Sequence, residues 1–334
     1  MSSATLFITG ATGYITGTFL TLFHASHPSI HIRCLVRDEY QAALFTSSYP
    51  SNITPVIGSL SNTALLRAEA SKASVVINGT GEKIEVLKAL IEGISLNPLN
   101  ISAQESSRPA FIHISGTSNV SHDVLGEKSP RVWSDVTDYD EILHLDESRT
   151  QMKSDNAVRS LSKELNVRSV ILAPPTILGH GLGVGRTETH QLLWYNAILE
   201  NGAPFLLGKG ENVWSVISVK DLGRAIEVFV DEILRGGDRL GFGNQGYYFI
   251  EAFEVSLMER AVAVGDRLVK EGKIKNGEVE LLSENEVERR YGGFMRYLVG
   301  SSSTVKADRL KALGWKPMEI DWKALVEEHG GRRC

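Results

Sequence analysis

Short apolar runs rich in β-branched residues alternate with longer segments of helical periodicity through the first half of the chain. This alternation predicts an α/β fold, because strands that alternate with helices form a parallel sheet covered on both faces. Right-handed crossovers make such a sheet doubly wound. The predicted strands are residues 6–8, 32–36, 54–57, 74–77, 110–114 and 169–172, and the predicted helices are 16–26, 39–46, 61–72, 82–96 and 155–165.

The pattern changes after residue 173, where Pro174 and Pro175 interrupt regular structure before a glycine-rich run over 179–185. We expect a helix over 192–199, a strand over 215–219 and a helix over 221–235. The polar stretch 121–150 is either a loop over a functional site or a surface excursion. The predicted first domain spans 1–175, with 213–235 returning to it, and a smaller, mostly helical lobe comprises 176–212 and 236–334.

A glycine turn follows the first predicted strand and precedes the first predicted helix, in the sequence from Ile8 to Gly17. Gly10 permits a tight turn, and Gly13 lets the backbone approach a pyrophosphate at the helix N-terminus. Thr16 occupies the place where a third glycine would allow close packing of strand and helix. This strand–turn–helix context predicts a dinucleotide site and a Rossmann arrangement.

Composition and charge narrow the class of protein. The formal net charge of −5, with 22% charged and 42% hydrophobic residues, argues against nucleic-acid binding, which needs a basic face. Two cysteines, Cys34 and Cys334, make neither a disulfide framework nor a zinc site. No signal peptide and no apolar stretch of about 18 residues are evident. We therefore expect a cytoplasmic protein without a membrane or nucleic-acid partner, either a monomer or a homodimer.

Six short motifs occur in an order that resembles the extended and atypical short-chain dehydrogenase/reductase superfamily, and within it the NmrA-like, fungal-type NAD(P)-binding proteins. The resemblance covers residues 5 to about 318. Besides the glycine turn, it is carried by Leu35–Asp38, Asn78–Gly81, Ser115–Ser118, Ala173–Ile177, Trp214–Asp221 and Leu313–Pro317.

The resemblance implies a nicotinamide dinucleotide, and Arg37 bears on which one. An arginine after the second strand can hold the 2′-phosphate of NADP, whereas an acidic residue there favours NAD. We expect NADP(H), with NAD(H) left open because Asp38 follows directly. The implied cofactor-binding residues are Gly10, Thr12, Gly13, Tyr14, Ile15, Arg37, Ser59, Leu60, Asn78, Gly79, Thr80, Ser115, Lys153, Pro174, Thr176 and Ile177.

The superfamily's usual catalytic pair, a tyrosine four residues before a lysine on one helix, is missing. None of the nine tyrosines has this spacing. Lys153 can take the place of the lysine, but Arg149 then stands at the tyrosine position, and arginine is a poor general acid. The candidate catalytic residues are therefore Thr117, Lys153 and Tyr139. Ser115 and Ser118 remain rivals of Thr117, and His113, His144 and His180 remain possible acids.

These observations favour an NADP(H)-dependent oxidoreductase that reduces a small hydrophobic metabolite without the usual Tyr–Lys pair. A redox-neutral isomerase, epimerase or cyclase on the same scaffold stays open, as does a non-catalytic NmrA-like sensor. No cluster of histidine, cysteine or carboxylate has metal-ligand spacing. Core packing or an apolar substrate wall is expected for a set of aromatic residues, which are Trp194, Tyr195, Phe205, Trp214, Tyr247 and Tyr248.

Overall fold

The computed structural model describes residues 4–49, 52–102, 104–129, 131–185 and 191–328, so Cys334 lies outside the described residues. A seven-stranded parallel sheet forms its centre, in the order β3-β2-β1-β4-β5-β8-β12. The predicted α/β, doubly wound fold is confirmed. The strands of this sheet are β1 (Thr5–Thr9), β2 (His31–Val36), β3 (Ile53–Ile57), β4 (Val75–Asn78), β5 (Ala110–Ile114), β8 (Arg168–Ala173) and β12 (Tyr247–Phe249).

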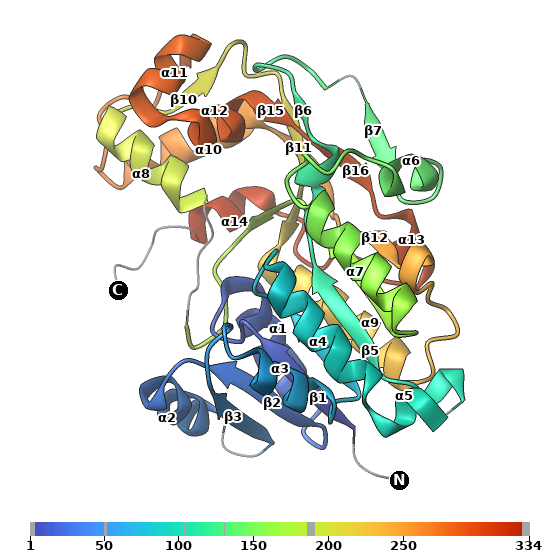
Figure 1. Ribbon diagram of the computed structural model, residues 1–334. Helices are drawn as coiled ribbons and strands as arrows, with labels where there is room; N and C mark the ends of the chain where they lie inside the picture. The colour runs from blue at the N-terminus through green and yellow to red at the C-terminus, as the bar shows by residue number, and fades with distance from the viewer. Residues whose placement is uncertain (1–3, 50–51, 103, 130, 186–190, 329–334) are drawn as a thin grey trace.

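Helices cover both faces of the sheet, as Figure 1 shows. On one face α3 (Thr63–Ala70), α4 (Ile84–Ser95) and α7 (Met152–Glu164) lie side by side. On the other face α1 (Tyr14–Ser26) packs against α9 (Val219–Leu234), which the chain supplies only after it has left the sheet. Helix α2 (Glu39–Ser48) packs on β3.

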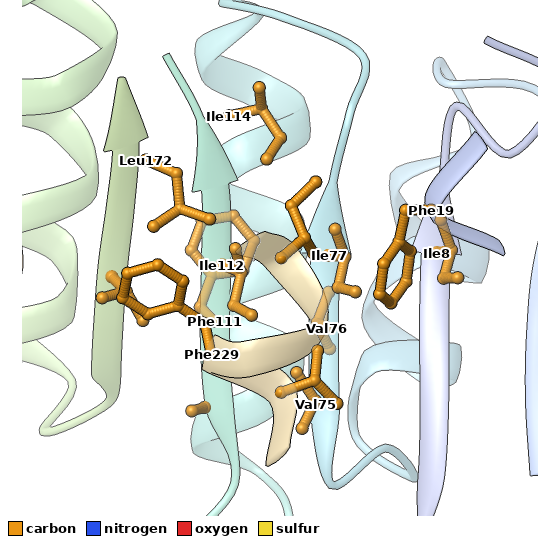
Figure 2. Close-up of a cluster of buried hydrophobic side chains, with 14 of the residues drawn as sticks. Ile8, Phe19, Val75, Val76, Ile77, Phe111, Ile112, Ile114, Leu172 and Phe229 are labelled. Atoms are coloured by element: carbon orange, nitrogen blue, oxygen red, sulfur yellow. The ribbon is translucent and has the colours of Figure 1, made fainter. Parts of the chain in front are cut away.

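The core lies on the central strands, where Ile8, Val76, Ile112 and Leu172 are fully buried. Figure 2 shows these strands with Phe19 of α1 and Phe229 of α9 among their side chains. Because both faces are covered, successive strand residues are buried instead of alternating between core and solvent. This explains why the strands read as continuous apolar runs in the sequence.

The second lobe has its own core, built on helices and small sheets. Figure 1 places it at the carboxyl-end side of the main sheet. Its helices are α8 (Gln191–Asn201), α10 (Leu257–Lys270), α11 (Glu284–Tyr291), α12 (Gly293–Gly300) and α14 (Trp322–Glu328). Its strands are β9 (Thr176–Leu178), β10 (Phe205–Leu207), β11 (Val213–Ser218), β13 (Phe253–Ser256) and β14 (Glu280–Leu282).

The polar stretch 121–150 is tied to the end of the chain. It contains β6 (His122–Asp123) and β7 (Val132–Ser134), which pair with β15 (Ser301–Ser302) and β16 (Thr304–Lys306). Backbone pairing at two places therefore anchors this stretch to the second lobe. The remaining helices are α5 (Pro98–Ser102), α6 (Tyr139–Leu143) and α13 (Asp308–Ala312).

Asp135 joins this stretch to the main sheet. Its carboxyl is fully buried and accepts hydrogen bonds from the backbone N–H of Phe249 (3.0 Å) and of Arg309 (3.1 Å). Burial raises the pKa of Asp135 to about 7. The protonated carboxyl is thus favoured in the folded state, where burial disfavours the charge.

We expect the stability of the protein relative to its Asp135→Asn variant to fall as the pH rises from about 4 to 7. A folded-state pKa above the unfolded value contributes stability below the unfolded pKa, and this contribution is lost through the folded pKa. The difference should change by roughly 3–4 kcal/mol across this range. Urea denaturation of both proteins at several pH values measures it, and a pH-independent difference would contradict the assignment.

Candidate dinucleotide site and active site

The glycine turn lies between β1 and α1, at the carboxyl edge of the sheet. Gly10 has a φ of +78°, and a Cβ on it would lie 2.7 Å from the carbonyl oxygen of Gly79, so only glycine fits. Gly13 is the N-cap of α1 and offers no capping side chain, and the first turn holds no acidic residue. No side chain of the first turn therefore competes with an anion at this helix end.

Thr16, at the third glycine position, closes the turn from within. Its side chain is buried, and its hydroxyl donates to the carbonyl oxygen of Gly10. Its Cγ2 lies 2.3 Å from where a Cβ on Gly79 would be, so Thr16 fills the space between the turn and the end of β4. Thr16 thus replaces the glycine that would allow close packing of strand and helix, and Gly79 at the end of β4 leaves the space for its side chain.

Arg37 follows β2, the strand next to the glycine turn. It is exposed, and within the described part of the chain its guanidinium has no hydrogen-bond or ion-pair partner. Asp38 is occupied differently, because its carboxylate caps α2 by accepting from the N–H of Gln41 (2.8 Å). Beyond the end of β3, the hydroxyls of Ser59 and Ser61 bond each other at 2.7 Å.

A row of polar side chains crosses three strands beneath the turn. Thr9, Asn78 and His113 are register partners on β1, β4 and β5. The hydroxyls of Thr9 (2.9 Å) and Thr80 (2.7 Å) donate to Asn78 Oδ1. Asn78 Nδ2 donates to His113 Nδ1 (3.1 Å), which leaves the proton of the neutral ring on Nε2.

The row ends at Asp155 on α7, which is fully buried. Asp155 Oδ2 accepts from Ser115 Oγ (2.7 Å) and from Asn119 Nδ2 (2.8 Å), while its Oδ1 lies 3.5 Å from His113 Nε2. We call Asn78, His113, Ser115, Asn119 and Asp155 the Asp155 cluster. It joins the carboxyl ends of β4 and β5 to the helix that carries the catalytic pair in the resembled superfamily.

Gln151 lies above the cluster, four residues before Asp155 at the start of α7. Its Oε1 accepts from Ser118 Oγ (2.7 Å), and its backbone N–H donates to Asn119 Oδ1 (2.7 Å). Glu82, an exposed residue after β4, faces this position, and burial together with the charge of Asp155 raises its pKa. Gln151 and Asp155 therefore have the spacing expected of a tyrosine and a lysine.

The expected catalytic residues are not all brought together. Lys153 is exposed on α7, whereas Asp155 faces Ser115. The Tyr139 hydroxyl donates to the carbonyl oxygen of Asn244 (2.7 Å) and accepts from the N–H of Tyr247 (3.2 Å), away from Ser118. Thr117 lies at the site but is buried, and its hydroxyl has no partner among the residues that the structure describes. His144 bonds its own helix at the carbonyl oxygen of Asp140.

Tyr297, on α12 of the second lobe, was not expected in the site. Its hydroxyl donates to Ser121 Oγ (3.1 Å), and that hydroxyl donates to the carbonyl oxygen of Ser118 (2.8 Å). Arg149 donates to the carbonyl oxygen of Ser121 (2.7 Å). Burial raises the pKa of Tyr297, while Ser121 and the positive charge of Arg149 act against this rise. No sequence spacing signals this approach, because it depends on how the lobes pack.

The glycine-rich run after β9, residues 179–185, packs on α1 and is called the strap. The Tyr14 hydroxyl donates to the carbonyl oxygen of Gly179 (2.6 Å), and the N–H of Leu182 donates to Thr18 Oγ1 (3.1 Å). A Cβ on Gly183 would lie 2.9 Å from the backbone of Gly17. The strap thus borders the helix end that offers its amides to an anion.

The segment around Pro174 connects the main sheet to the second lobe beside the site. The carbonyl oxygen of Pro174 accepts from the N–H of Thr117 (3.0 Å), and β9, with Thr176 and Ile177, pairs with β11. The aromatic residues considered for a substrate wall are all largely buried in the two cores. They are Trp194, Tyr195, Phe205, Trp214, Tyr247 and Tyr248.

Over the described ranges, no group of three or more histidine, cysteine or carboxylate side chains could hold a metal ion. In the same ranges no helix is both long and apolar enough to span a membrane.

No protein-family model matches the chain. It is 27% identical over 335 residues to the oxidase UcsJ of an Acremonium species, covering 94% of this chain and 92% of that protein. A dTDP-glucose 4,6-dehydratase from Bacillus anthracis, in complex with NAD, is 17% identical with a TM-score of 0.64, over 98% of this chain and 95% of that one.

A UDP-glucose 4-epimerase from Thermotoga maritima, solved with UDP-glucose, is 12% identical with a TM-score of 0.63, over 97% of this chain and 96% of that one. At these identities the structural neighbours confirm the Rossmann fold and no more. Function must therefore come from the site itself.

Proposed function

We propose that the protein is an NADP(H)-dependent oxidoreductase that acts on a small hydrophobic metabolite. The observation that carries this proposal is Arg37, whose guanidinium is unpaired among the described residues and which follows the strand paired with β1, the strand that leads to the α1 N-terminus; that helix end has no side-chain cap, while Asp38 caps α2. A helix end suits the pyrophosphate, and a free arginine suits the 2′-phosphate. Both features fit the adenosine half of NADP, and the fold shared with NAD-bound enzymes supports the same cofactor class.

The residues in the nicotinamide half differ from those of the usual Tyr–Lys mechanism. When bound, the nicotinamide supplies or accepts a hydride. We propose that the protein's own part is to supply a proton from the Tyr297 phenol, with Arg149 as the nearby cation in place of lysine. Ser118 and Gln151 then orient the polar group of the substrate, since both have side chains at the partly exposed end of the site.

The Asp155 cluster supports the backbone and side chains of this site. Its buried side chains hold the ends of β4, β5 and α7 together through hydrogen bonds that leave few side-chain orientations open. Asp155 and His113 are fully buried, so in this proposal they position Ser115 and Asn119 and do not touch the substrate. Asn119 in turn fixes the backbone of Gln151.

Arg37→Ala is expected to weaken NADPH binding about 10- to 100-fold while NADH binding stays within about twofold. The reason is the loss of a charge-assisted contact to the 2′-phosphate, which NADH lacks. Isothermal titration with each cofactor measures the two affinities. Arg289→Ala, which removes an exposed arginine in the second lobe, is the control. An equal loss for both cofactors would remove the support for NADP.

Turnover separates the redox proposal from the alternatives. The purified protein, given NADPH and a panel of apolar ketones, enones and imines, should oxidise the cofactor, which lowers its absorbance at 340 nm. Product without a net change in absorbance would instead indicate a redox-neutral enzyme. Tight cofactor binding with no turnover on the whole panel would count against an oxidoreductase and favour a sensor.

A further inference from the structure

Two buried arginines lie inside the C-terminal lobe among apolar side chains, and neither belongs to the glycine turn or the Asp155 cluster. A cavity of about 30 Å³ separates α8 from α10, next to β9 and α14. Its walls are largely apolar or aromatic, with Trp194, Tyr195, Val264 and Val326 among them. Two arginines of α10, Arg260 and Arg267, also line it, although the position is nearly closed to solvent.

Arg260 carries a charge that has no counter-ion among the described residues. Its side chain is buried, with 4% of the residue exposed. Its Nη2 donates to Gln191 Oε1 (2.6 Å) and its guanidinium lies 5.6 Å from the centre of the Trp194 ring, whereas its Nε has no partner in the described ranges. No carboxylate among the described residues pairs with it. Burial lowers the pKa of Arg260 to about 10, the effect expected of a desolvated cation.

Arg267 lines the same cavity and also has a buried donor without a partner among the described residues. It lies seven residues after Arg260, so both side chains project from one face of α10. Its Nε donates to Glu271 (2.7 Å) and its Nη1 to the carbonyl oxygen of Val326 (2.6 Å), but its Nη2 has no partner within the part of the chain that the structure describes. Two guanidinium groups thus leave N–H donors unsatisfied beside one small cavity.

A buried charge without a partner is strongly unfavourable and is seldom kept without a use. A ligand that satisfies both guanidinium groups needs one negative charge and two acceptor oxygens. It must also be small, because the cavity holds only a few heavy atoms. A carboxylate provides two coplanar oxygens and one charge, which matches arginine geometry. A phosphate would bring a second negative charge, whereas Arg267 is already paired with Glu271 and only Arg260 needs neutralising.

We propose that Arg260 and Arg267 form a binding site for a small monocarboxylate in the C-terminal lobe. The carboxylate accepts hydrogen bonds from Arg260 Nε and Arg267 Nη2 and neutralises Arg260, and a short apolar substituent contacts Val264 and Val326. This site does not depend on the cofactor or the reaction proposed above. A carboxylate bound there would connect α8 to α10. Binding of an organic acid would therefore stabilise the second lobe.

Acetate is the probe for this site. Isothermal titration of the full chain with sodium acetate should show one saturable site with a Kd on the order of millimolar, the range expected for so few heavy atoms. At ten times that Kd, acetate should raise the Tm by about 2–3 °C above sodium chloride at equal ionic strength. An equal response to chloride, or no saturable heat, would overturn the proposal.

Arg260→Met tests whether the charge is needed for the ligand. This variant should lose the acetate response and, in acetate-free buffer, unfold at the same temperature as the parent or higher, because an unpaired buried charge is gone. Lys270→Met, which removes an exposed charge from the same helix, should keep the response. Should Arg260→Met fail to fold, Arg267→Lys must weaken acetate binding at least fivefold. Retention of the response in either arginine variant refutes the site.

Discussion

Asp155→Ala is expected to lower the free energy of unfolding by about 3–5 kcal/mol, because two buried hydrogen-bond donors lose their acceptor at a cost of roughly 1–3 kcal/mol each and packed volume is lost. The substitution leaves the Ser115 hydroxyl and the Asn119 amide without their acceptor, and it opens a void beside His113. Urea denaturation followed by circular dichroism measures the change. The effect should appear without cofactor, because the cluster is part of the folded protein.

Two further variants separate this explanation from a general weakness of α7. Lys163→Ala removes an exposed charge from the same helix and should change stability by no more than about 0.5 kcal/mol. Asp155→Asn keeps the volume and one acceptor oxygen, so it should fall between the two. If Asp155→Ala is no more destabilising than Lys163→Ala, the cluster does not hold the strand ends together.

Tyr297→Phe should lower kcat about 100- to 10,000-fold while NADPH affinity stays within about twofold. This is the usual contribution of a positioned proton donor, and the phenylalanine ring can keep the edge-on packing against Trp214. Steady-state kinetics with any substrate that the panel yields, together with cofactor titration, measures both quantities. A loss confined to KM would indicate that the phenol binds substrate without donating a proton.

Tyr291→Phe is the matched control, because it removes a phenol of the same lobe that donates to Asn201 (3.0 Å) and does not contact Ser121. Its kcat should stay within about twofold of the parent. Equal losses in both variants would show that Tyr297 acts only by supporting the lobe. A preserved kcat in Tyr297→Phe would require another proton donor, and Glu82, whose pKa is raised by burial and by Asp155, would be the next residue to test.

The strands along the first half of the chain and the glycine turn were predictable because they depend on local signals. Apolar runs and a strand–turn–helix pattern need no knowledge of distant residues. Strand β12 was not predicted, since it has only three residues and joins the sheet by pairing with β8 far back in the chain. For its tyrosines, Tyr247 and Tyr248, the sequence left open whether they pack in the core or line a substrate pocket. Both are buried in the core.

The active site was harder to predict for a reason of helical geometry. Lys153 was expected at the position of the superfamily's lysine, but in the structure Asp155 faces the site. The two residues are two positions apart, and two positions turn a side chain by about 200° around a helix. The structure therefore exposes Lys153 and buries Asp155. Tyr297 depends on the packing of α12 over residues 118–121, which no spacing within one element can indicate.

Helix α9 and strand β12 pack on the main sheet but come late in the sequence, which affects how the protein folds during synthesis. A ribosome that has released only residues 1–175 presents α1 without α9, and β8 without its edge partner. Phe19 and Leu22 of α1, which lie against Gly223 in the complete protein, are then exposed to water. The unpaired edge of β8 can form hydrogen bonds with strands of other chains. We therefore expect the N-terminal half, expressed alone, to aggregate, and productive folding to wait until residue 249 has been synthesised.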